Sequence, residues 1–189
     1  MTRTFDPHRP VPDALLADLV DLASRSPSAG KTQGWHLVVL EEAETDRFWD
    51  LTLPAERRDT FGWRGLLDAP VIALPLADPE AYLRRYDEPD KQAAGLGSST
   101  EAWPVPYWTV DTAFAVMTLL LGAEAAGLGA LFFGIFGGEA ELRDALGLPD
   151  PMELLGAIAL GWPAGEDRPG HSAGRRRRPP EEILHRGGW

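Results

Sequence analysis

Residues 27–35, PSAGKTQGW, join two segments whose apolar residues repeat differently. The segment before them places its apolar residues on one face of a helix that begins near Asp13, namely Leu15, Leu16, Leu19, Val20 and Ala23. Pro27 disfavours helix at Ser26, so we expect the helix to end there. The segment after them, 36–40, is a short apolar run of the β type. A helix, a tight turn and a strand are therefore expected in this order.

The remaining apolar runs predict further helices and strands in alternation. We expect helices at 43–53, 107–126 and 139–146, and strands at 71–74, 130–133 and 154–160. This order indicates a mixed α/β or α+β sheet protein, and Gly127 is placed to end the longest helix. The segment 78–106 reads as an irregular loop, and such long loops are usually functional or disordered. The length and hydrophobic content predict one domain, 1–189. Its polar, Gly- and Pro-rich tail predicts an extended arm over about 163–189.

Composition excludes several classes of chemistry and location. The chain of 189 residues has no Cys, which excludes disulfides, thiol nucleophiles and cysteine-ligated metals. Its net charge of −11 argues against non-specific binding to nucleic acid or to anionic membranes. The first residues lack the apolar core of a signal peptide, and Glu124 and several glycines interrupt the apolar stretch 113–131, which reads as a buried helix. We expect a cytoplasmic protein that binds neither nucleic acid nor membrane.

Several familiar motifs are incomplete in this chain. Gly30-Lys31-Thr32 resembles the end of a P-loop, but Arg25 occupies the place of its first Gly and the turn precedes a strand. Gly127-Leu128-Gly129 lacks the third Gly of a dinucleotide fingerprint, because Phe132 stands there. The four His show no metal-ligand spacing, and no Gly-x-Ser-x-Gly is present. Without an acid–base or nucleophile constellation, an enzyme of this sequence would take its chemistry from a cofactor.

Four consecutive arginines, Arg175–Arg178, stand out against the acidic background. Such a run is most often a solvated basic tail. Its position before Pro179-Pro180 and an amphipathic segment at 181–185 favours an arm that folds back and brings its charges to a phosphate. A nucleic-acid-binding or partner-binding module would rest on this run alone, and the acidic net charge disfavours it.

Taken in order, these stretches resemble the nitroreductase family of FMN-dependent oxidoreductases over nearly the whole chain. Family members begin with Arg-Arg-Ser-x-Arg-x-Phe and a Pro-Val-Pro helix start, which Arg3-Thr4-Phe5 and Pro10-Val11-Pro12-Asp13 match in part. The family turn Pro-Ser-x-x-Asn-x-Gln-Pro-Trp corresponds to 27–35, with Lys31 in place of Asn. An apolar helix that ends in Gly-Leu-Gly corresponds to 126–129, and a closing Lys/Arg-x-Arg-x-Pro segment to 175–179.

The resemblance implies an α+β fold, a nitroreductase-like three-layer α/β/α sandwich with a central mixed, mostly antiparallel sheet. It also implies an arm-exchanged homodimer with two FMN sites at the interface. Carried over by position, the cofactor-binding residues are Arg3, Pro27, Ser28, Ala29, Lys31, Gln33, Gly134, Ile135, Arg175 and Arg177. The turn residues 27–29 would come from the partner subunit.

The same resemblance gives individual roles to the other site residues. Arg3 would lie near the flavin pyrimidine, where a cation stabilises the negative charge of the reduced ring. The backbone N–H groups of Gly134 and Ile135 would face the flavin N5 edge, and Gly permits a close approach. Arg175 and Arg177 would bind the 5′-phosphate, because guanidinium forks suit its geometry.

The implied activity passes a hydride or electrons from NADH or NADPH through flavin N5 to a nitroaromatic, a quinone or a similar conjugated small molecule. No side chain is expected to act as a catalyst, and the small-molecule substrate itself is not specified. The residues Trp103, Tyr107 and Trp108 either line the substrate cleft or pack in the core or dimer interface, and both interpretations stay open.

The alternative is a degenerate member of the family that stores or senses FMN without turnover. Met1 falls where the family has Ser, so the phosphate-binding arginines before it are missing. Either the natural N-terminus is longer or the four-arginine run compensates. This departure and Lys31 favour the alternative.

Overall fold

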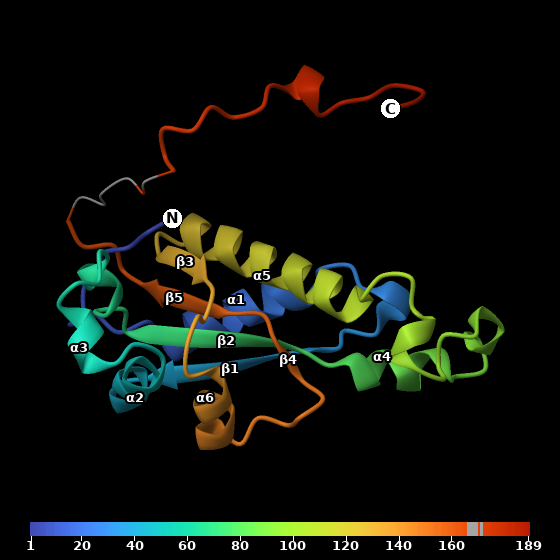
Figure 1. Cartoon of the computed structure of the whole chain (residues 1–189), viewed down its shortest axis with the longest axis horizontal. Coiled ribbons are helices and arrows are strands. Elements are labelled where there is room, and N and C mark those ends of the chain that lie inside the picture. The colour runs from blue at the N-terminus through green and yellow to red at the C-terminus, as the bar shows by residue number, and fades with distance from the viewer. Residues whose placement is uncertain (166–169, 171) are drawn as a thin grey trace.

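The computed structural model describes residues 1–165, 170 and 172–189, and an antiparallel sheet lies at its centre (Figure 1). The strands are β1 (Trp35–Glu41), β2 (Val71–Ala77), β3 (Gly129–Phe133), β4 (Glu153–Leu154) and β5 (Ala157–Gly161). Their order is β1-β2-β5-β3, and β4 also pairs with β2. Every pairing among these strands is antiparallel. The parallel pairing that a mixed sheet needs is therefore absent from the part of the chain that the structure describes.

Helices cover both faces of this sheet. They are α1 (Asp13–Ser24), α2 (Ala43–Thr52), α3 (Ala55–Arg58), α4 (Pro79–Tyr86), α5 (Tyr107–Ala125) and α6 (Glu139–Leu146). Helices α1 and α5 pack on one face, α2 and α6 pack on the other, and α3 and α4 lie at opposite ends (Figure 1). This arrangement is a three-layer α/β/α sandwich, so the predicted α+β fold class is confirmed.

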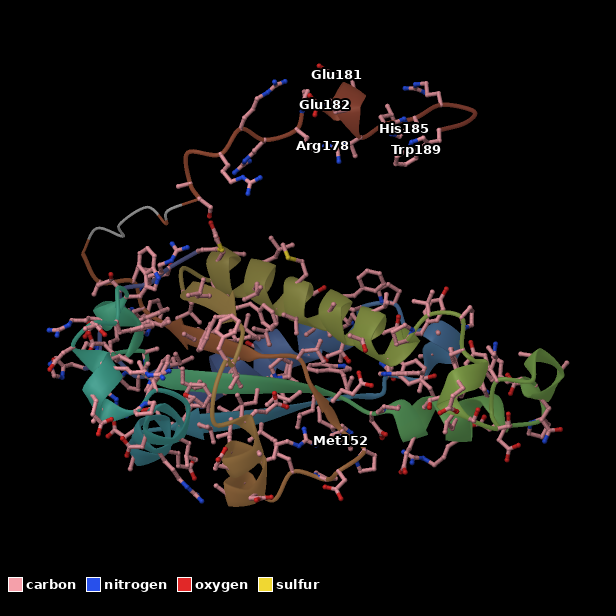
Figure 2. All side chains as sticks on the ribbon, in the orientation of Figure 1. Met152, Arg178, Glu181, Glu182, His185 and Trp189 are labelled. Carbon is pink, nitrogen blue, oxygen red and sulfur yellow. The ribbon has the colours of Figure 1, made fainter. Side chains whose placement is uncertain are left out.

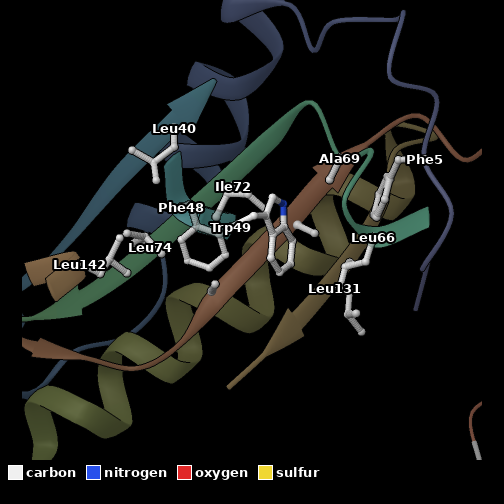
Figure 3. Packing of buried hydrophobic residues seen from close by; sticks show 12 residues of the cluster. Phe5, Leu40, Phe48, Trp49, Leu66, Ala69, Ile72, Leu74, Leu131 and Leu142 are labelled. Atoms are coloured by element: carbon white, nitrogen blue, oxygen red, sulfur yellow. The ribbon is translucent and has the colours of Figure 1, made fainter. Parts of the chain in front are cut away.

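The central strand β2 separates two hydrophobic cores. All of its residues are buried, and their side chains alternate between the two faces of the sheet. Ile72 and Leu74 pack with residues of α2 and α6 in the core that Figure 3 shows, whereas Val71 and Ala73 pack with residues of α1 and α5. A strand buried on both faces reads as a continuous apolar run, which is why the sequence predicts a strand at 71–74.

Helix α5 is apolar around most of its circumference but is only partly buried. The residue after its last turn, Gly127, has a φ of 80°, and the N–H of Leu128 donates to the carbonyl of Ala123 at 2.9 Å. This geometry is a Schellman cap, and the predicted end of the helix is confirmed.

The prediction that this helix is buried is wrong for one of its sides. Four apolar residues at helical spacing are exposed there, and we call them the α5 stripe: Tyr107, Phe114, Met117 and Leu121. No helix within the described ranges is long and apolar enough to cross a membrane.

The segment 78–106, predicted as an irregular loop, contains helix α4. Asp78 caps this helix by accepting a hydrogen bond from the N–H of Ala81 at 3.0 Å. Pro79 occupies the first helical position, where a missing N–H costs nothing. The Asp-Pro pair is a helix-start signal that the Gly, Ser and Pro residues further along obscured. The single strand predicted at 154–160 is also wrong, because Gly156, with a φ of 142°, separates β4 from β5.

The N-terminal segment is tied to the sheet, whereas the C-terminal tail is not. The N–H of Thr2 donates to the carbonyl of Ala130 in β3 at 3.1 Å, and Phe5 forms a β-bridge with Pro163. Residues 172–189 extend away from the sandwich (Figure 2). The tail therefore adds no layer to the sandwich of its own chain.

Two glycines that flank α6 provide a test of this packing. Gly138 and Gly147 have left-handed backbone, with φ of 70° and 62°. A Cβ at Gly138 would overlap the carbonyl oxygen of Leu51, whereas a Cβ at Gly147 would meet no atom within 4 Å. We expect Gly147→Ala to lower the free energy of unfolding by about 1 kcal/mol through backbone strain alone. Gly138→Ala should lower it by at least about 3 kcal/mol, because steric overlap adds to the strain. Chemical denaturation measures both, and equal losses would contradict the close packing of α2 against α6.

Candidate cofactor site

A pocket of about 740 Å³ opens between α2, α3 and the segment after β3. Its volume lies within the roughly 300–1,000 Å³ of small-molecule sites. Three residues that the sequence predicts to bind a cofactor line this pocket together: Arg3, Gly134 and Ile135. The hydrogen bond between Thr2 and Ala130 aligns the N-terminal segment with β3, and this alignment brings Arg3 to residues distant from it in the sequence.

Aromatic side chains form much of the pocket wall, and no sequence motif reveals them. Phe48 and Trp49 reach the pocket from α2, and Phe133 reaches it from β3. The rings of Trp49 and Phe133 are stacked, with centroids 5.7 Å apart and 6° between their planes. Phe61 and Trp63 add two more rings from the segment after α3. Such a wall suits a flat conjugated ligand. The adjacent aromatic residues Phe48 and Trp49 are visible in the sequence, but only the packing of α2 determines that they face the pocket.

Arg3 places a positive charge beside these rings. Its guanidinium carbon lies 4.7 Å from the centroid of the Trp63 ring, which is a cation–π contact. Glu56 and Arg57 of α3 also line the pocket, so their opposite charges offset one another there. A cation next to an apolar wall favours a ligand that is aromatic and can carry negative charge.

The segment after β3 offers backbone donors to the same pocket. No hydrogen bond within the described part of the chain uses the N–H of Gly134 or of Ile135. The ring of Phe136 lies over Gly134, and a Cβ added at Gly134 would be 3.0 Å from an atom of that ring. Phe136 is itself 99% exposed. The Nε1 of Trp49 is buried and likewise has no partner among the described residues. A ligand with acceptors on the edge of a ring would satisfy the N–H groups of Gly134 and Ile135.

The turn at 27–33 lies elsewhere and shapes a separate hollow of about 600 Å³. The predicted site residues in this turn are Pro27, Ser28, Ala29, Lys31 and Gln33. The turn leads into β1 at the end of the sheet where β2 finishes, because Trp35 pairs with Ala77. One chain therefore does not bring the turn to the pocket of Arg3. Its contribution from a partner subunit stays a prediction.

The tail arginines are also apart from the pocket. Among residues 172–189, Arg176 and Arg178 form ion pairs with Glu182, whereas Arg175 and Arg177 have no ion-pair partner there. Figure 2 labels Arg178 and Glu182. All four are exposed. The binding of a phosphate by Arg175 and Arg177 stays a prediction.

Trp103, Tyr107 and Trp108, which could line the substrate cleft or pack in the core or dimer interface, fall into two groups in the structure. Trp103 and Trp108 are only 8% and 5% exposed and pack against Tyr82. Each indole N–H is used inside the fold, since Trp103 donates to the carbonyl of Leu96 and Trp108 to Glu153, both at 2.8 Å. Core packing therefore describes these two rings in this chain, whereas Tyr107 belongs to the exposed α5 stripe. Their role toward a substrate stays a prediction.

The fold and the pocket define an α+β protein with a site for a flat aromatic ligand beside a cation. Residues 1–162 match the nitroreductase family, so this chain belongs to that family and is an oxidoreductase. The match ends before the arginine run.

Individual relatives agree with this assignment. An NADH dehydrogenase of Thermus thermophilus is 32% identical over 176 residues, which cover 86% of this chain and 82% of that protein. A nitroreductase family protein of Streptococcus pneumoniae has the same fold, with a TM-score of 0.72 at 18% identity over 98% of this chain and 94% of that one. An FMN-dependent nitroreductase of Clostridium difficile gives a TM-score of 0.66 at 16% identity over 100% of this chain and 94% of that one.

The alternating pattern of the tail arginines supplies a matched test of phosphate binding. We expect the double variant Arg175→Ala/Arg177→Ala to lose FMN affinity by at least about 100-fold, because each charge-assisted hydrogen bond contributes about 1.5–3 kcal/mol. The double variant Arg176→Ala/Arg178→Ala removes the same charge from the pairs with Glu182, and it should keep its affinity within about threefold. Titration of the apoprotein with FMN, followed by flavin fluorescence, measures both. Equal losses would show that only the total charge of the tail matters.

Proposed function

We propose that this chain is an FMN-dependent oxidoreductase that uses NADH or NADPH to reduce a nitroaromatic, a quinone or a similar conjugated small molecule. The observation that carries the proposal is the convergence of Arg3, Gly134 and Ile135 on one pocket with an aromatic wall. These are residues that the family resemblance assigns to the flavin by position. Membership of the nitroreductase family supports an NAD(P)H-dependent oxidoreductase.

The residues of the pocket fit FMN in shape and in chemistry. When bound, FMN supplies the two-electron chemistry, and the protein supplies orientation and charge. The stacked rings of Trp49 and Phe133 keep water from the inner side of the pocket. Arg3 would stabilise negative charge on the reduced flavin. The N–H groups of Gly134 and Ile135, which directly follow β3, would hold the edge of the flavin.

The proposal includes a homodimer. One chain carries the pocket of Arg3 and the turn at 27–33 in different places, so a second copy would bring its turn to the first copy's pocket. The α5 stripe, together with Leu22 on the neighbouring α1, is an apolar surface that its own chain leaves uncovered. Contiguous apolar surface of this kind marks an interaction site.

A visible absorption spectrum of the purified protein tests the cofactor and the activity in sequence. We expect a flavin spectrum, with FMN released into the supernatant after heat denaturation. Anaerobic addition of NADH or NADPH should then bleach the flavin, and a nitroaromatic or a quinone should restore its colour. A protein that binds FMN but is bleached by neither reductant is the storage or sensing protein of the alternative. A colourless protein that added FMN does not reconstitute would overturn the proposal.

A charge placed in the α5 stripe tests the homodimer. We expect Met117→Lys/Leu121→Lys to convert the dimer to a monomer, because two charges would have to be desolvated in an apolar interface. Glu141→Lys, at an exposed position of α6 on the opposite face of the sheet, should leave the dimer intact. Light scattering after size exclusion gives the mass, and FMN content is measured on the same fractions. A double variant that stays dimeric would place the interface elsewhere.

A further inference from the structure

The turn at 27–33 adopts a conformation that its own residues do not favour. Left-handed backbone is unfavourable for residues with a side chain, yet two such residues in this turn adopt it: Lys31 (φ 55°) and Gln33 (φ 53°). Hydrogen bonds inside the turn close it, since the N–H of Lys31 donates to the Ser28 carbonyl at 2.9 Å and that of Gln33 to the Ser28 Oγ at 3.0 Å. They do not fix its orientation on the sandwich.

Asp111 in α5 supplies that orientation from behind the turn. Its Oδ2 accepts a hydrogen bond from the N–H of Ala29 and another from the hydroxyl of Tyr82, each at 2.7 Å. Asp111 is 7% exposed and Tyr82 is 0% exposed. Burial, with the hydrogen bond to Asp111, raises the pKa of the Tyr82 hydroxyl, so Tyr82 is protonated and donates at neutral pH.

Helix α4 holds the turn from a second direction. The Nε of Arg85 donates to the carbonyl of Gly30 at 2.9 Å, and two hydrogen bonds of 2.8 Å to Asp90 hold the same guanidinium in place. The ring of Tyr86 closes on Gly30, where a Cβ would lie 3.0 Å from it. The backbone N–H of residue 29 and the carbonyl of residue 30 are thus both held by side chains from 78–111.

We propose that Asp111 is a positioning residue of the cofactor site, which holds Ala29 so that the Ser28–Lys31 side of the turn is presented to the flavin of the partner subunit. Tyr82 and Arg85 support the same arrangement. The inference rests on the proposed function, because that function places the turn at the flavin. The segment 78–106 then acts as a brace behind the turn.

Glu153 provides a matched control within the chain. Like Asp111, it is a carboxylate that accepts two hydrogen bonds, here from Trp108 Nε1 and Thr109 Oγ1, each at 2.8 Å. Both of those donors lie on α5, as Asp111 does, but their hydrogen bonds go to Glu153 and not to the turn. The variants for comparison are therefore Asp111→Ala, Asp111→Asn, Tyr82→Phe and Glu153→Gln in the full-length chain.

Hydrogen exchange of the apoprotein, followed by mass spectrometry, tests the brace without any cofactor. We expect Asp111→Ala to raise the exchange rates of amides in 28–34 at least tenfold relative to those of β2, because the Ala29 N–H loses its acceptor. Tyr82→Phe should raise them less, which keeps the test decisive if Asp111→Ala fails to fold. Asp111→Asn retains an acceptor oxygen and should stay within about threefold of the wild type, as should Glu153→Gln. A rise that is equal in β2, or the same in Glu153→Gln, would overturn the proposal.

Titration of the same apoproteins with FMN tests the consequence for the site. We expect Asp111→Ala to bind FMN about tenfold more weakly than the wild type, with Asp111→Asn restoring the affinity and Glu153→Gln leaving it unchanged. An exchange effect without a change in affinity would show a structural role only and would overturn the positioning role. A wild-type protein that does not bind FMN would instead refute the proposed function, and the exchange data would still decide whether Asp111 holds the turn.

Discussion

The burial of β2 on both faces is the constraint on which the rest of the molecule depends. Residues 71–74 of this strand belong alternately to the two cores, so a shift of one residue would exchange the two sets of side chains. The antiparallel partners β1 and β5 are aligned by this register. Helix α2 is then placed where its aromatic residues meet Phe133 of β3, and the wall of the pocket follows from that contact.

The two halves of the proposed site are held by different kinds of interaction. The pocket is shaped by aromatic packing, with Arg3 carried in by an N-terminal segment that is bonded to β3. The turn is held by polar contacts from Asp111 and Arg85, and its internal hydrogen bonds alone leave its orientation free. Packing tolerates small changes of side chain better than a buried polar contact does, because an unpaired buried donor or acceptor carries the full cost of desolvation.

Much of the fold could be predicted from the sequence, because its periodicity reflects burial. The apolar residues on one face of α1 indicate an amphipathic helix, and the continuous apolar run of β2 indicates a strand buried on both faces. The predictions failed where local composition and tertiary context disagree. Gly, Ser and Pro in 78–106 concealed the Asp78-Pro79 start of α4, and the apolar surface of α5 did not reveal that one side of it faces outward.

In the candidate site too, some residues are predicted from the sequence, whereas others are brought into the pocket only by packing. The family resemblance assigns Arg3, Gly134 and Ile135 to the cofactor site by position, and the fold brings them together. The sequence motifs do not predict the aromatic wall, because Phe48, Trp63 and Phe133 come from α2, from the segment after α3 and from β3, without a common spacing. A buried Asp in an apolar helix is unusual, and Asp111 could have been singled out on that ground alone.

The separation of the turn from the pocket within one chain has a thermodynamic consequence. A ligand that binds only where two subunits meet favours their association, and by reciprocity association strengthens the binding of the ligand. In a site built this way, the cofactor would dissociate from the protein on dilution as subunits part. The fraction of cofactor retained would then report how much of the chain is present in the cell, and dimerisation would become measurable from the flavin alone.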